Sequence, residues 1–329
     1  MKKGILEAIG NTPLIQLTRV FDDLRFRLYA KLEALNPGGS MKDRPALRIL
    51  SEAFASGEIS RDTVVIESSS GNMGIGLAQA CSYHGLSFIC VVDPKTTAQN
   101  IRLLEAYGAT VDRVLEPDPH TGEFLQARLN RVRALLASTR NGFWPNQYAN
   151  VNNARAHHQT MGEIVTALQG RVDLVFCATS TCGTLRGCAE YAREQESSTR
   201  VIAVDAVGSV IFGGPPAKRL LPGHGAGVRP PLYQADLADD FVQVTDLECV
   251  TGCRLLARRE GILAGGSSGA VIMAVDRLRR EVPDDAVCVA ILADRGERYL
   301  DTVYSDEWVE EHFGRVSHLW EKAVEVYHA

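Results

Sequence analysis

Lys42 is the residue whose type and setting could do covalent chemistry. It lies in the segment NPGGSMKDRP, residues 36–45, where proline, glycine and serine precede the lysine and an apolar helical pattern follows Asp43. The pattern predicts one amine at a loop-to-helix corner, where a lysine held next to a carbonyl group can form a Schiff base. A surface lysine in a glycine-rich turn is the alternative. A Walker-type phosphate loop is excluded because Lys42 follows Met41 and precedes Asp43, out of the Gly-Lys-Ser/Thr register.

A second candidate is the loop ESSSGNMG, residues 67–74, which precedes a helical pattern. Ser69, Ser70 and Asn72 would stand beside free backbone N–H groups at a helix start, where an anion is favoured. The loop could therefore hold a carboxylate. Serine and asparagine are also common as plain N-caps, so a purely local role is the alternative.

The same loop raises the question of a nicotinamide cofactor. Asp93 ends the following predicted strand, at about the distance where a ribose-binding acid belongs in a dinucleotide site. However, the glycines Gly71, Gly74 and Gly76 follow the order G-x-x-G-x-G and not G-x-G-x-x-G. The spacing argues against a nicotinamide-dependent oxidoreductase, which stays an alternative from another class.

A third loop, TSTCGT at residues 179–184, again joins an apolar strand to a helix. Ser180, Thr181 and Thr184 offer hydroxyl groups next to Gly183, and a monophosphate binds to such hydroxyl and backbone donors at a helix start. A solvated helix cap would look the same in isolation. The glycine-rich run AGGSSGA, residues 264–270, is a weaker signal of the same kind.

Composition limits the class of protein. The chain has 329 residues, 45% of them hydrophobic, and a net charge of -5, so it has no basic footprint for nucleic acid or anionic membranes. No apolar run approaches the roughly 20 residues that cross a bilayer. Glu7, Gly10 and Asn11 interrupt the stretch that a signal peptide would need, so we expect a cytoplasmic protein. The eight cysteines form no C-x-x-C pair, and we expect neither a disulfide framework nor a metal site.

Strand and helix patterns alternate along the chain and predict an α/β fold. Near-continuous apolar strands argue for parallel sheets covered on both faces. The first half predicts strands at 28–33, 63–67, 88–92 and 110–114 and helices at 45–57, 75–84 and 97–107. The second half predicts strands at 172–178, 200–205 and 286–292 and helices at 184–194, 249–260 and 267–280. Residues 143–153 are the expected crossing between two α/β units, and residues 305–328 are expected to form a terminal helix.

Several motifs together carry a family resemblance. GNTPLIQL, NPGGSMKDR, SSSGNMG, STCGT, GILAGGSSGA and ADRGERYLDT occur in this order between about Gly10 and Trp308. The chain therefore resembles the fold-type II pyridoxal phosphate enzymes of the cysteine synthase and cystathionine β-synthase family. The resemblance implies pyridoxal phosphate as cofactor and a fold like that of the tryptophan synthase β-subunit. It also implies a large cofactor-binding domain formed by residues 1–41 and 152–329, and a smaller mobile α/β domain formed by residues 42–151.

The resemblance also implies roles for particular residues. Lys42 would bind the cofactor covalently and later move the Cα proton, and Asn72 would contact the cofactor's 3-hydroxyl. Ser69, Ser70 and Asn72 would hold the carboxylate of the amino acid. The cofactor's phosphate would lie in the loop formed by Ser180, Thr181, Cys182, Gly183 and Thr184.

Two features depart from the family pattern. The phosphate loop usually reads G-T-G-G-T, whereas here Ser180 and Cys182 replace two glycines. The segment that ordinarily brings a serine to the pyridine nitrogen reads Ala293, Asp294, Arg295. Ser267 or a neighbour is the candidate for that place, or the ring nitrogen is handled differently.

A narrower resemblance concerns the substrates. Met41 and Pro45, together with VVDPK, NQYAN, VDAVGSVIFG and DRGERYLD, resemble the branch of the family that joins O-phospho-L-serine to L-glutamate. That branch supplies a precursor of 2,3-diaminopropionate for siderophores. A homodimer and a downstream NAD-dependent dehydrogenase are expected with it. The alternatives are a cysteine synthase using O-acetylserine or O-phosphoserine, a relative using cyanide or homocysteine, a serine or threonine dehydratase, and a cofactor-binding regulatory subunit without turnover.

Such substrates bring several anionic groups, which guanidinium groups bind well. We predict that Arg128, in FLQARLNRVRALL, holds the leaving phosphate and that Tyr148 lies near the second substrate. Ser209 lies in the glycine-containing loop 208–229, together with His224, and this loop is predicted to close over bound substrate. The other candidate arginines are Arg155, Arg219, Arg229 and Arg295. His157 and His158 are expected to be surface or helix-packing residues.

Overall fold

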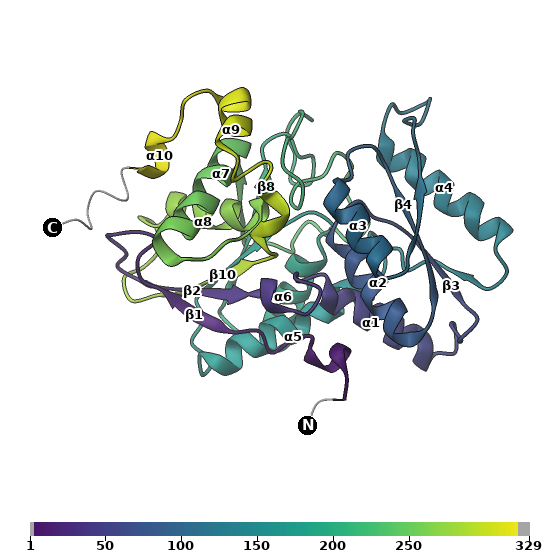
Figure 1. Cartoon of the computed structure of the whole chain (residues 1–329). Helices are drawn as coiled ribbons and strands as arrows, with labels where there is room; N and C mark the ends of the chain where they lie inside the picture. The colour runs from purple at the N-terminus through teal and green to yellow at the C-terminus, as the bar shows by residue number, and fades with distance from the viewer. Residues whose placement is uncertain (1–2, 322–329) are drawn as a thin grey trace. The chain divides into compact units, whose positions relative to one another are not determined.

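The computed structural model describes residues 3–321 and divides the chain into two compact units (Figure 1). Unit 1 comprises Met1–Gly10 and Asn36–Ala156, and unit 2 comprises Asn11–Leu35 and His157–Ala329. The chain therefore passes between the units near residues 10, 35 and 156. The mobility of the smaller domain stays a prediction.

Unit 1 is built on a four-stranded sheet in which every pairing is parallel, in the order β5-β4-β3-β6. Its strands are β3 (Val64–Ser68), β4 (Ser87–Val92), β5 (Thr110–Arg113) and β6 (Gly142–Phe143). Its helices are the 3-10 turn η1 (Ile5–Ala8), α1 (Asp43–Ala55), α2 (Asn72–His84), α3 (Ala98–Ala106) and α4 (Phe124–Ser138). Helix α5 (Val151–Ala167) begins in unit 1 and ends in unit 2.

Alternating side chains of β3 and β4 supply two separate cores in unit 1. Val65 and Phe88 pack in the cluster that also contains residues of α1 and α2. Ile66 and Val91 point into a second cluster with Val132 of α4. Successive side chains of a strand point to opposite faces, so α4 covers the face of the sheet opposite to α1 and α2. Figure 1 shows α4 apart from α1, α2 and α3.

Unit 2 is built on a six-stranded sheet in the order β1-β2-β10-β7-β8-β9. Its strands are β1 (Leu14–Leu17), β2 (Arg27–Leu32), β7 (Leu174–Ala178), β8 (Arg200–Ala206), β9 (Asp240–Val244) and β10 (Val287–Leu292). Only β1 pairs antiparallel, with Leu14 opposite Lys31. The central strands β7 and β10 consist almost wholly of buried apolar residues, as expected for a parallel sheet covered on both faces.

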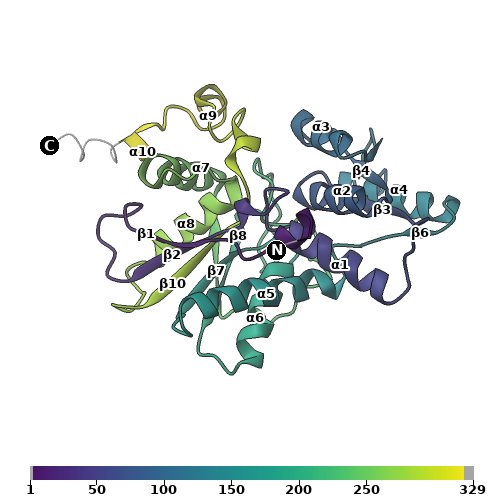
Figure 2. The ribbon, with the colours of Figure 1, turned by 60° about the horizontal axis from the view of Figure 1, so that its bottom comes forward.

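Helices cover both faces of the sheet in unit 2 (Figure 2). They are α6 (Gly183–Glu194), α7 (Asp246–Leu255) with its π-helical continuation η3 (Leu256–Glu260), α8 (Gly266–Leu278), α9 (Asp306–Phe313) and α10 (His318–Glu321), with 3-10 turns η2 (Glu33–Leu35) and η4 (Gly296–Tyr299). In Figure 2, α5 and α6 lie on the face of the sheet away from α7 and α8. Glycines allow α7 and α8 to pack closely, because a Cβ on Gly252 would lie 2.2 Å from the backbone oxygen of Gly269.

The two sheets, whose strands are mostly parallel, and the helices between the strands confirm the predicted α/β fold class. Several boundaries differ. Helix α1 begins at Asp43, two residues before Pro45, because proline is tolerated in the first turn of a helix. The crossing at residues 143–153 contains the end of β6 and the start of α5, and strands β1 and β9 were not predicted.

The expected terminal helix at residues 305–328 is wrong as one element, because α9 ends at Phe313 and α10 begins at His318. Gly314, with φ +75°, follows α9 and allows the chain to leave the helix. Residues 322–328 of that prediction lie outside the described residues. Within residues 3–321, the helices are all too short or too polar to cross a membrane.

Candidate active site

Lys42 lies at the predicted corner, immediately before α1. Its backbone N–H donates to Ser40 Oγ at 3.2 Å, and its carbonyl accepts from Ala46 N at 3.1 Å. The Asp43 carboxylate, at the first position of α1, accepts from Gly38 N. A Cβ on Gly38 would lie 2.5 Å from that carboxylate, so any other residue there would displace it. The turn is therefore held against the helix start, which fixes the backbone of the half-buried Lys42.

Helix α2 approaches the same corner through a glycine. A Cβ on Gly76 would lie 3.1 Å from both the Lys42 carbonyl oxygen and Ala46 Cβ. That separation is tighter than an ordinary van der Waals contact, so the small residue sets how close α2 comes to α1. The two loops expected to meet the same amino acid, 36–42 and 68–72, are thus positioned by one packed pair of helices in unit 1.

The predicted carboxylate loop ends at Asn72, the first residue of α2. Ser69 is buried, and its Oγ accepts from Gly74 N at 2.9 Å. Ser69 therefore satisfies one of the N–H groups at the start of α2, which is the local role left open from sequence. Ser70 is half-buried, and its carbonyl accepts from Asn100 Nδ2 at 3.0 Å. Contacts of Ser69, Ser70 and Asn72 with substrate stay predictions.

The predicted phosphate loop lies in unit 2, between β7 and α6. Cys182 has φ +65°, in the left-handed region, and Gly183 begins α6. Thr181 Oγ1 accepts from Gly183 N at 3.4 Å, and Thr184 Oγ1 lies 3.3 Å from His157 Nε2. A left-handed residue before a helix start turns successive N–H groups toward one point, which forms a concave anion site.

These donors fit the phosphate of pyridoxal phosphate. The first N–H groups of α6 have no acceptor within the helix, and threonine hydroxyls stand next to them. Ser180 Oγ donates to Gly225 O at 3.2 Å, and Gly225 N donates to Thr179 O at 2.7 Å. The segment around Gly225 is therefore attached to this loop. Ser180, where the family usually has glycine, thus has a structural role. The contact of the 180–184 loop with the cofactor stays a prediction.

Ser267, the candidate partner for the pyridine nitrogen, is buried in the first turn of α8. The backbone at Gly223 lies against it, because a Cβ there would be 3.4 Å from Ser267 Oγ. Asp294, in the segment that ordinarily brings a serine to the pyridine nitrogen, is buried and accepts from the Tyr299 hydroxyl at 2.7 Å. The structure leaves the role of Ser267 a prediction.

The loop at residues 208–231 is anchored at several points. Ser209 is buried, and its Oγ accepts from Ile211 N at 3.3 Å and from Ala226 N at 3.0 Å. His224 is buried with its Nε2 3.4 Å from Cys249 Sγ, and burial lowers the pKa of its imidazole to about 4. Ser209 thus holds the loop together. Its contact with substrate and the closing of the loop stay predictions.

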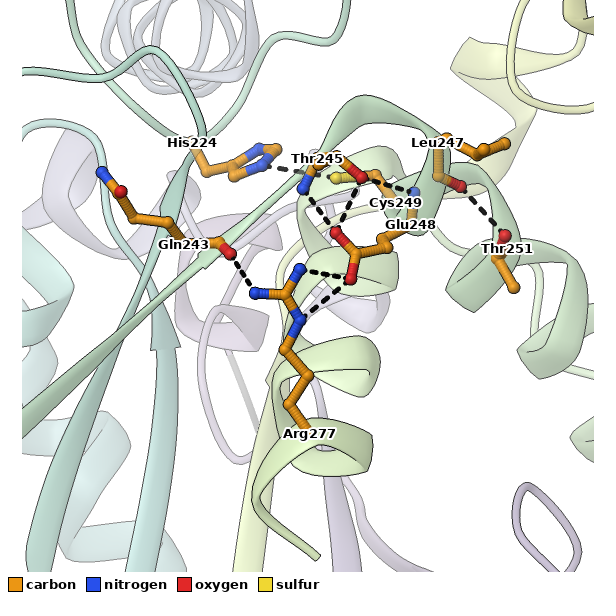
Figure 3. A network of polar contacts seen from close by, with 8 residues as sticks. All are labelled: His224, Gln243, Thr245, Leu247, Glu248, Cys249, Thr251 and Arg277. Carbon is orange, nitrogen blue, oxygen red and sulfur yellow. Dashed lines mark hydrogen bonds and ion pairs between the residues drawn. The ribbon is translucent and has the colours of Figure 1, made fainter. Parts of the chain in front are cut away.

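Figure 3 shows where His224 meets α7. Thr245 and Glu248 form a capping box at the start of this helix, and Arg277 of α8 donates to Glu248. The Arg277 guanidinium also donates to the carbonyl of Gln243 in β9. Strand β9, helices α7 and α8 and the 208–231 loop are therefore connected to one another near His224.

Arg128 of α4 is buried in unit 1, where its Nε lies 3.1 Å from Asp93 Oδ2. It also makes a hydrogen bond with the half-buried Tyr148. Burial raises the pKa of the Tyr148 hydroxyl, and the charge of Arg128 opposes that change. The two predicted substrate residues Arg128 and Tyr148 are therefore brought together. Their contact with a substrate stays a prediction.

Asp93, the residue considered above as a possible ribose-binding acid, contacts protein groups in the structure. Its carboxylate pairs with Arg128 and accepts from Lys95 N at 2.9 Å. Sequence reasoning also missed Glu67, a fully buried carboxylate at the end of β3. A signal was present, because Glu67 is the one charged residue in the apolar run TVVIE.

The remaining candidates have mainly structural contacts. Arg229 lies 4.7 Å from the ring of Tyr233 and donates to Ile211 O. Arg295 donates to Ala34 O, Arg219 lies 3.5 Å from His224 O, and Arg155 is exposed. His157 packs inside unit 2 as expected, although its contact with Thr184 was not predicted.

Unit 1 has a lysine corner and a serine-rich helix start, and unit 2 has a hydroxyl-lined anion loop, which are the features expected of a cofactor enzyme. Residues 5–294 match the family described as "Pyridoxal-phosphate dependent enzyme". The chain belongs to this family and is a pyridoxal-phosphate-dependent enzyme.

Individual relatives narrow the comparison. The chain is 48% identical over 308 residues to an N-(2-amino-2-carboxyethyl)-L-glutamate synthase of Ralstonia nicotianae, covering 93% of this chain and 91% of that protein. A crystal structure of O-acetylserine-dependent cystathionine β-synthase from Helicobacter pylori is similar with a TM-score of 0.86 and 31% identity, covering 93% of this chain and 99% of that one. A hydrogen sulfide-producing enzyme from Fusobacterium nucleatum gives a TM-score of 0.85 and 34% identity, covering 91% and 100%.

Proposed function

We propose that this enzyme replaces the phosphate group of O-phospho-L-serine with the amino group of L-glutamate. The product is N-(2-amino-2-carboxyethyl)-L-glutamate, and inorganic phosphate is released. The observation that carries the proposal is the 48% identity, over 93% of the chain, to a synthase of that name. The buried Arg128 next to the half-buried Tyr148 supports it, because a guanidinium matches the oxygen atoms of a phosphate.

Lys42 is the proposed anchor of the cofactor and the base of the reaction. Pyridoxal phosphate, when bound, withdraws electrons from Cα of the attached amino acid, which makes its proton acidic. The Lys42 amine would remove that proton and return it to Cα after the second amino acid has added to Cβ. The hydrogen bonds of the 36–43 turn hold the lysine backbone while its side chain does so.

The other predicted residues would orient the reactants. Asn72 and the N–H groups at the start of α2 would bind the carboxylate of phosphoserine, and the 180–184 loop would bind the cofactor's phosphate. Arg128 would bind the leaving phosphate. Glutamate reacts through its neutral amine, so one of its protons leaves as the new carbon–nitrogen bond forms.

The proposal extends to the setting of the reaction. All eight cysteines are buried as free thiols, which supports a cytoplasmic location, since disulfides form in oxidising compartments. We propose further that the enzyme forms a homodimer and that its product supplies 2,3-diaminopropionate for siderophores. Release of 2,3-diaminopropionate from the product requires oxidation at the glutamate carbon–nitrogen bond, so an NAD-dependent dehydrogenase is the class of enzyme expected to act next.

The test is phosphate release by the purified, cofactor-loaded protein. With O-phospho-L-serine, we expect release that depends on L-glutamate and not on sulfide, and a product with the mass of the two joined amino acids less phosphoric acid. Sulfide-dependent release with cysteine as product would instead support a cysteine synthase. Release without any second substrate, with pyruvate formed, would indicate a dehydratase.

A further inference from the structure

Glu67 is a buried carboxylate that the proposed reaction does not yet use. It is 0% exposed and stands one residue before the end of β3. Its Oε1 accepts from Ser68 N at 2.8 Å and from Trp144 Nε1 at 3.1 Å, and its Oε2 accepts from Gln147 N at 3.1 Å. Three N–H donors therefore converge on one acceptor. An ionised carboxylate, which only accepts, satisfies such a set, whereas an amide would turn a donor toward one of them.

These hydrogen bonds connect β3 to the turn at residues 146–150. Gln147 Nε2 also donates to Ser68 O at 3.1 Å, so the main chain and side chain of Gln147 both attach to the end of the strand. Within the turn, Asn146 has φ +47°, and its carbonyl accepts from Ala149 N at 3.0 Å. Tyr148 follows Gln147 in this turn. Its place is therefore determined by the Glu67 contacts.

The same carboxylate belongs to a buried group of charges. Arg128 lowers the pKa of Glu67 and makes a hydrogen bond with Tyr148, and Asp93 pairs with Arg128. Burial is the larger effect and raises the pKa of the Glu67 carboxyl to about 7. Two other titratable groups face Glu67: the hydroxyl of Tyr148, whose pKa is raised mainly by burial, and the thiol of Cys90, whose pKa is raised to about 12, mainly by burial. Glu67 therefore changes charge near neutral pH.

We propose that Glu67 is a positioning residue that holds the turn at residues 146–150, and with it Tyr148, next to Arg128 for the phosphate of O-phospho-L-serine. The inference rests on the proposed function, because it concerns the phosphate of that substrate. Glu67 sets the affinity for the phosphorylated side chain and leaves the binding of the amino acid's carboxylate, which is assigned to the start of α2, unchanged.

The proposal has a consequence for pH. Below about pH 7 a protonated Glu67 places an O–H among three N–H donors, which weakens the attachment of the turn. The KM for O-phospho-L-serine should therefore rise as the pH falls through 7. The substrate's own phosphate titrates near pH 6 and adds to this rise. A variant without a titratable group at position 67 separates the two contributions.

The first experiment compares wild-type holoenzyme with Glu67→Gln. The ligands are O-phospho-L-serine and L-serine, and half-saturation is read from the visible spectrum of the bound cofactor. We expect Glu67→Gln to weaken the binding of O-phospho-L-serine about tenfold, because hydrogen bonds around a charged site are lost. The binding of L-serine should weaken less than twofold. KM for O-phospho-L-serine should rise in parallel, kcat should change less than about twofold, and the step near pH 7 should be lost. Equal weakening of both ligands, or none, would overturn the inference.

A second variant keeps the test decisive where Glu67→Gln does not fold. Trp144→Phe removes one donor to Glu67 but keeps an aromatic ring, and Trp308→Phe in unit 2 is the matched control. Trp144→Phe should weaken the binding of O-phospho-L-serine about threefold relative to that of L-serine. The pH at which the KM changes should move upward, because the ionised Glu67 carboxylate loses a hydrogen bond. Trp308→Phe should change neither. No selective effect of Trp144→Phe would overturn the inference.

The tryptophan emission of the cofactor-free protein gives a readout without turnover. Subtracting the emission of Trp144→Phe from that of the wild type gives the emission of Trp144, which should change with pH near 7. The same subtraction in the Glu67→Gln background should give an emission that does not change with pH. Failure of the proposed function is recognised separately. A wild-type enzyme that releases no phosphate with glutamate overturns both, whereas an active wild type without a selective Glu67→Gln effect overturns only the role of Glu67.

Discussion

At the scale of residues, the chemistry of this protein depends on a few side chains held by short local contacts. Lys42 is fixed through its backbone, because its own N–H donates to Ser40 Oγ and the N–H of Gly38 donates to the Asp43 carboxylate. Arg128 is fixed through its side chain, because it pairs with Asp93 inside unit 1. The two kinds of attachment lead to different consequences of mutation. Removing the lysine side chain leaves its turn in place, whereas removing the arginine leaves a buried charge without its partner.

Lys42→Ala should abolish the visible absorbance of the bound cofactor and reduce turnover by roughly 100- to 10,000-fold, the usual contribution of a proton-transferring side chain. Absorption spectra before and after borohydride reduction, with peptide mass mapping, locate the cofactor. Circular dichroism should be unchanged. Lys95→Ala, an exposed lysine in the same unit, is the control and should retain both properties. Retained turnover in Lys42→Ala would place the base elsewhere.

Arg128→Leu alone should destabilise the protein by about 3–5 kcal/mol, because Asp93 stays buried and charged. Adding Asp93→Asn should recover most of that loss, as measured by urea unfolding. The double variant should still show a KM for O-phospho-L-serine raised roughly tenfold to a hundredfold, the cost of losing a charged hydrogen-bond donor. A double variant with wild-type KM would remove Arg128 from the phosphate site and leave it a structural residue.

At the scale of elements, strand ends and helix starts supply the predicted site. The 69–71 loop follows β3 and leads into α2, and the 179–182 loop follows β7 and leads into α6. The helices that carry these loops are in turn set by glycines. Gly76 lets α2 approach the Lys42 carbonyl, and Gly252 lets α7 approach α8, whose first turn carries Ser267. The position of each loop therefore depends on helix packing some distance from it.

Gly252→Ala tests the packing of α7 on α8. The new Cβ would lie 2.2 Å from the backbone oxygen of Gly269, so the helices must move apart. We expect a loss of about 1–3 kcal/mol in the free energy of unfolding, as for overpacked interiors. Gly162→Ala in α5 is the matched control, because its Cβ would make ordinary contacts at 3.5 Å with Tyr191. It should stabilise the protein by about 0.5–1 kcal/mol. Equal effects of the two variants would contradict the packing argument.

At the scale of the whole molecule, the chain forms two units with separate cores. The predicted cofactor residues fall in both units, with Lys42 and Asn72 in unit 1 and the 180–184 loop and Ser267 in unit 2. A ligand that binds only the folded state raises the stability of every part it contacts. Cofactor content should therefore change the unfolding of the protein as a whole.

Removal of pyridoxal phosphate should lower the midpoint of thermal unfolding by roughly 5–10 °C, since saturation at about a hundred times Kd is worth about 2.7 kcal/mol. Differential scanning calorimetry of the protein before and after cofactor removal measures this shift. Re-addition should restore the midpoint in wild type, and more weakly in Lys42→Ala. An unchanged midpoint in wild type would mean that the cofactor does not bind the folded protein under these conditions.

The sequence by itself determined much of this account. Apolar strands alternating with helical patterns indicate parallel sheets, because backbone pairing and burial depend on local periodicity. Lys42, the 67–74 loop and the 179–184 loop are recognisable from sequence because glycine, serine and threonine at a helix start have local physical roles. The same reasoning predicted the start of α6 one residue too late and the end of β8 one residue too early.

Only the tertiary structure decided which distant residues meet. The pairing of Arg128 with Asp93, and the convergence of Ser68, Trp144 and Gln147 on Glu67, join segments up to 80 residues apart. No local pattern encodes such contacts, because they follow from the register of β3 with β6 and the packing of α4 on the sheet. Burial then changes the chemistry: a glutamate that would be an ordinary acid in a peptide titrates near neutral pH once the fold removes it from water.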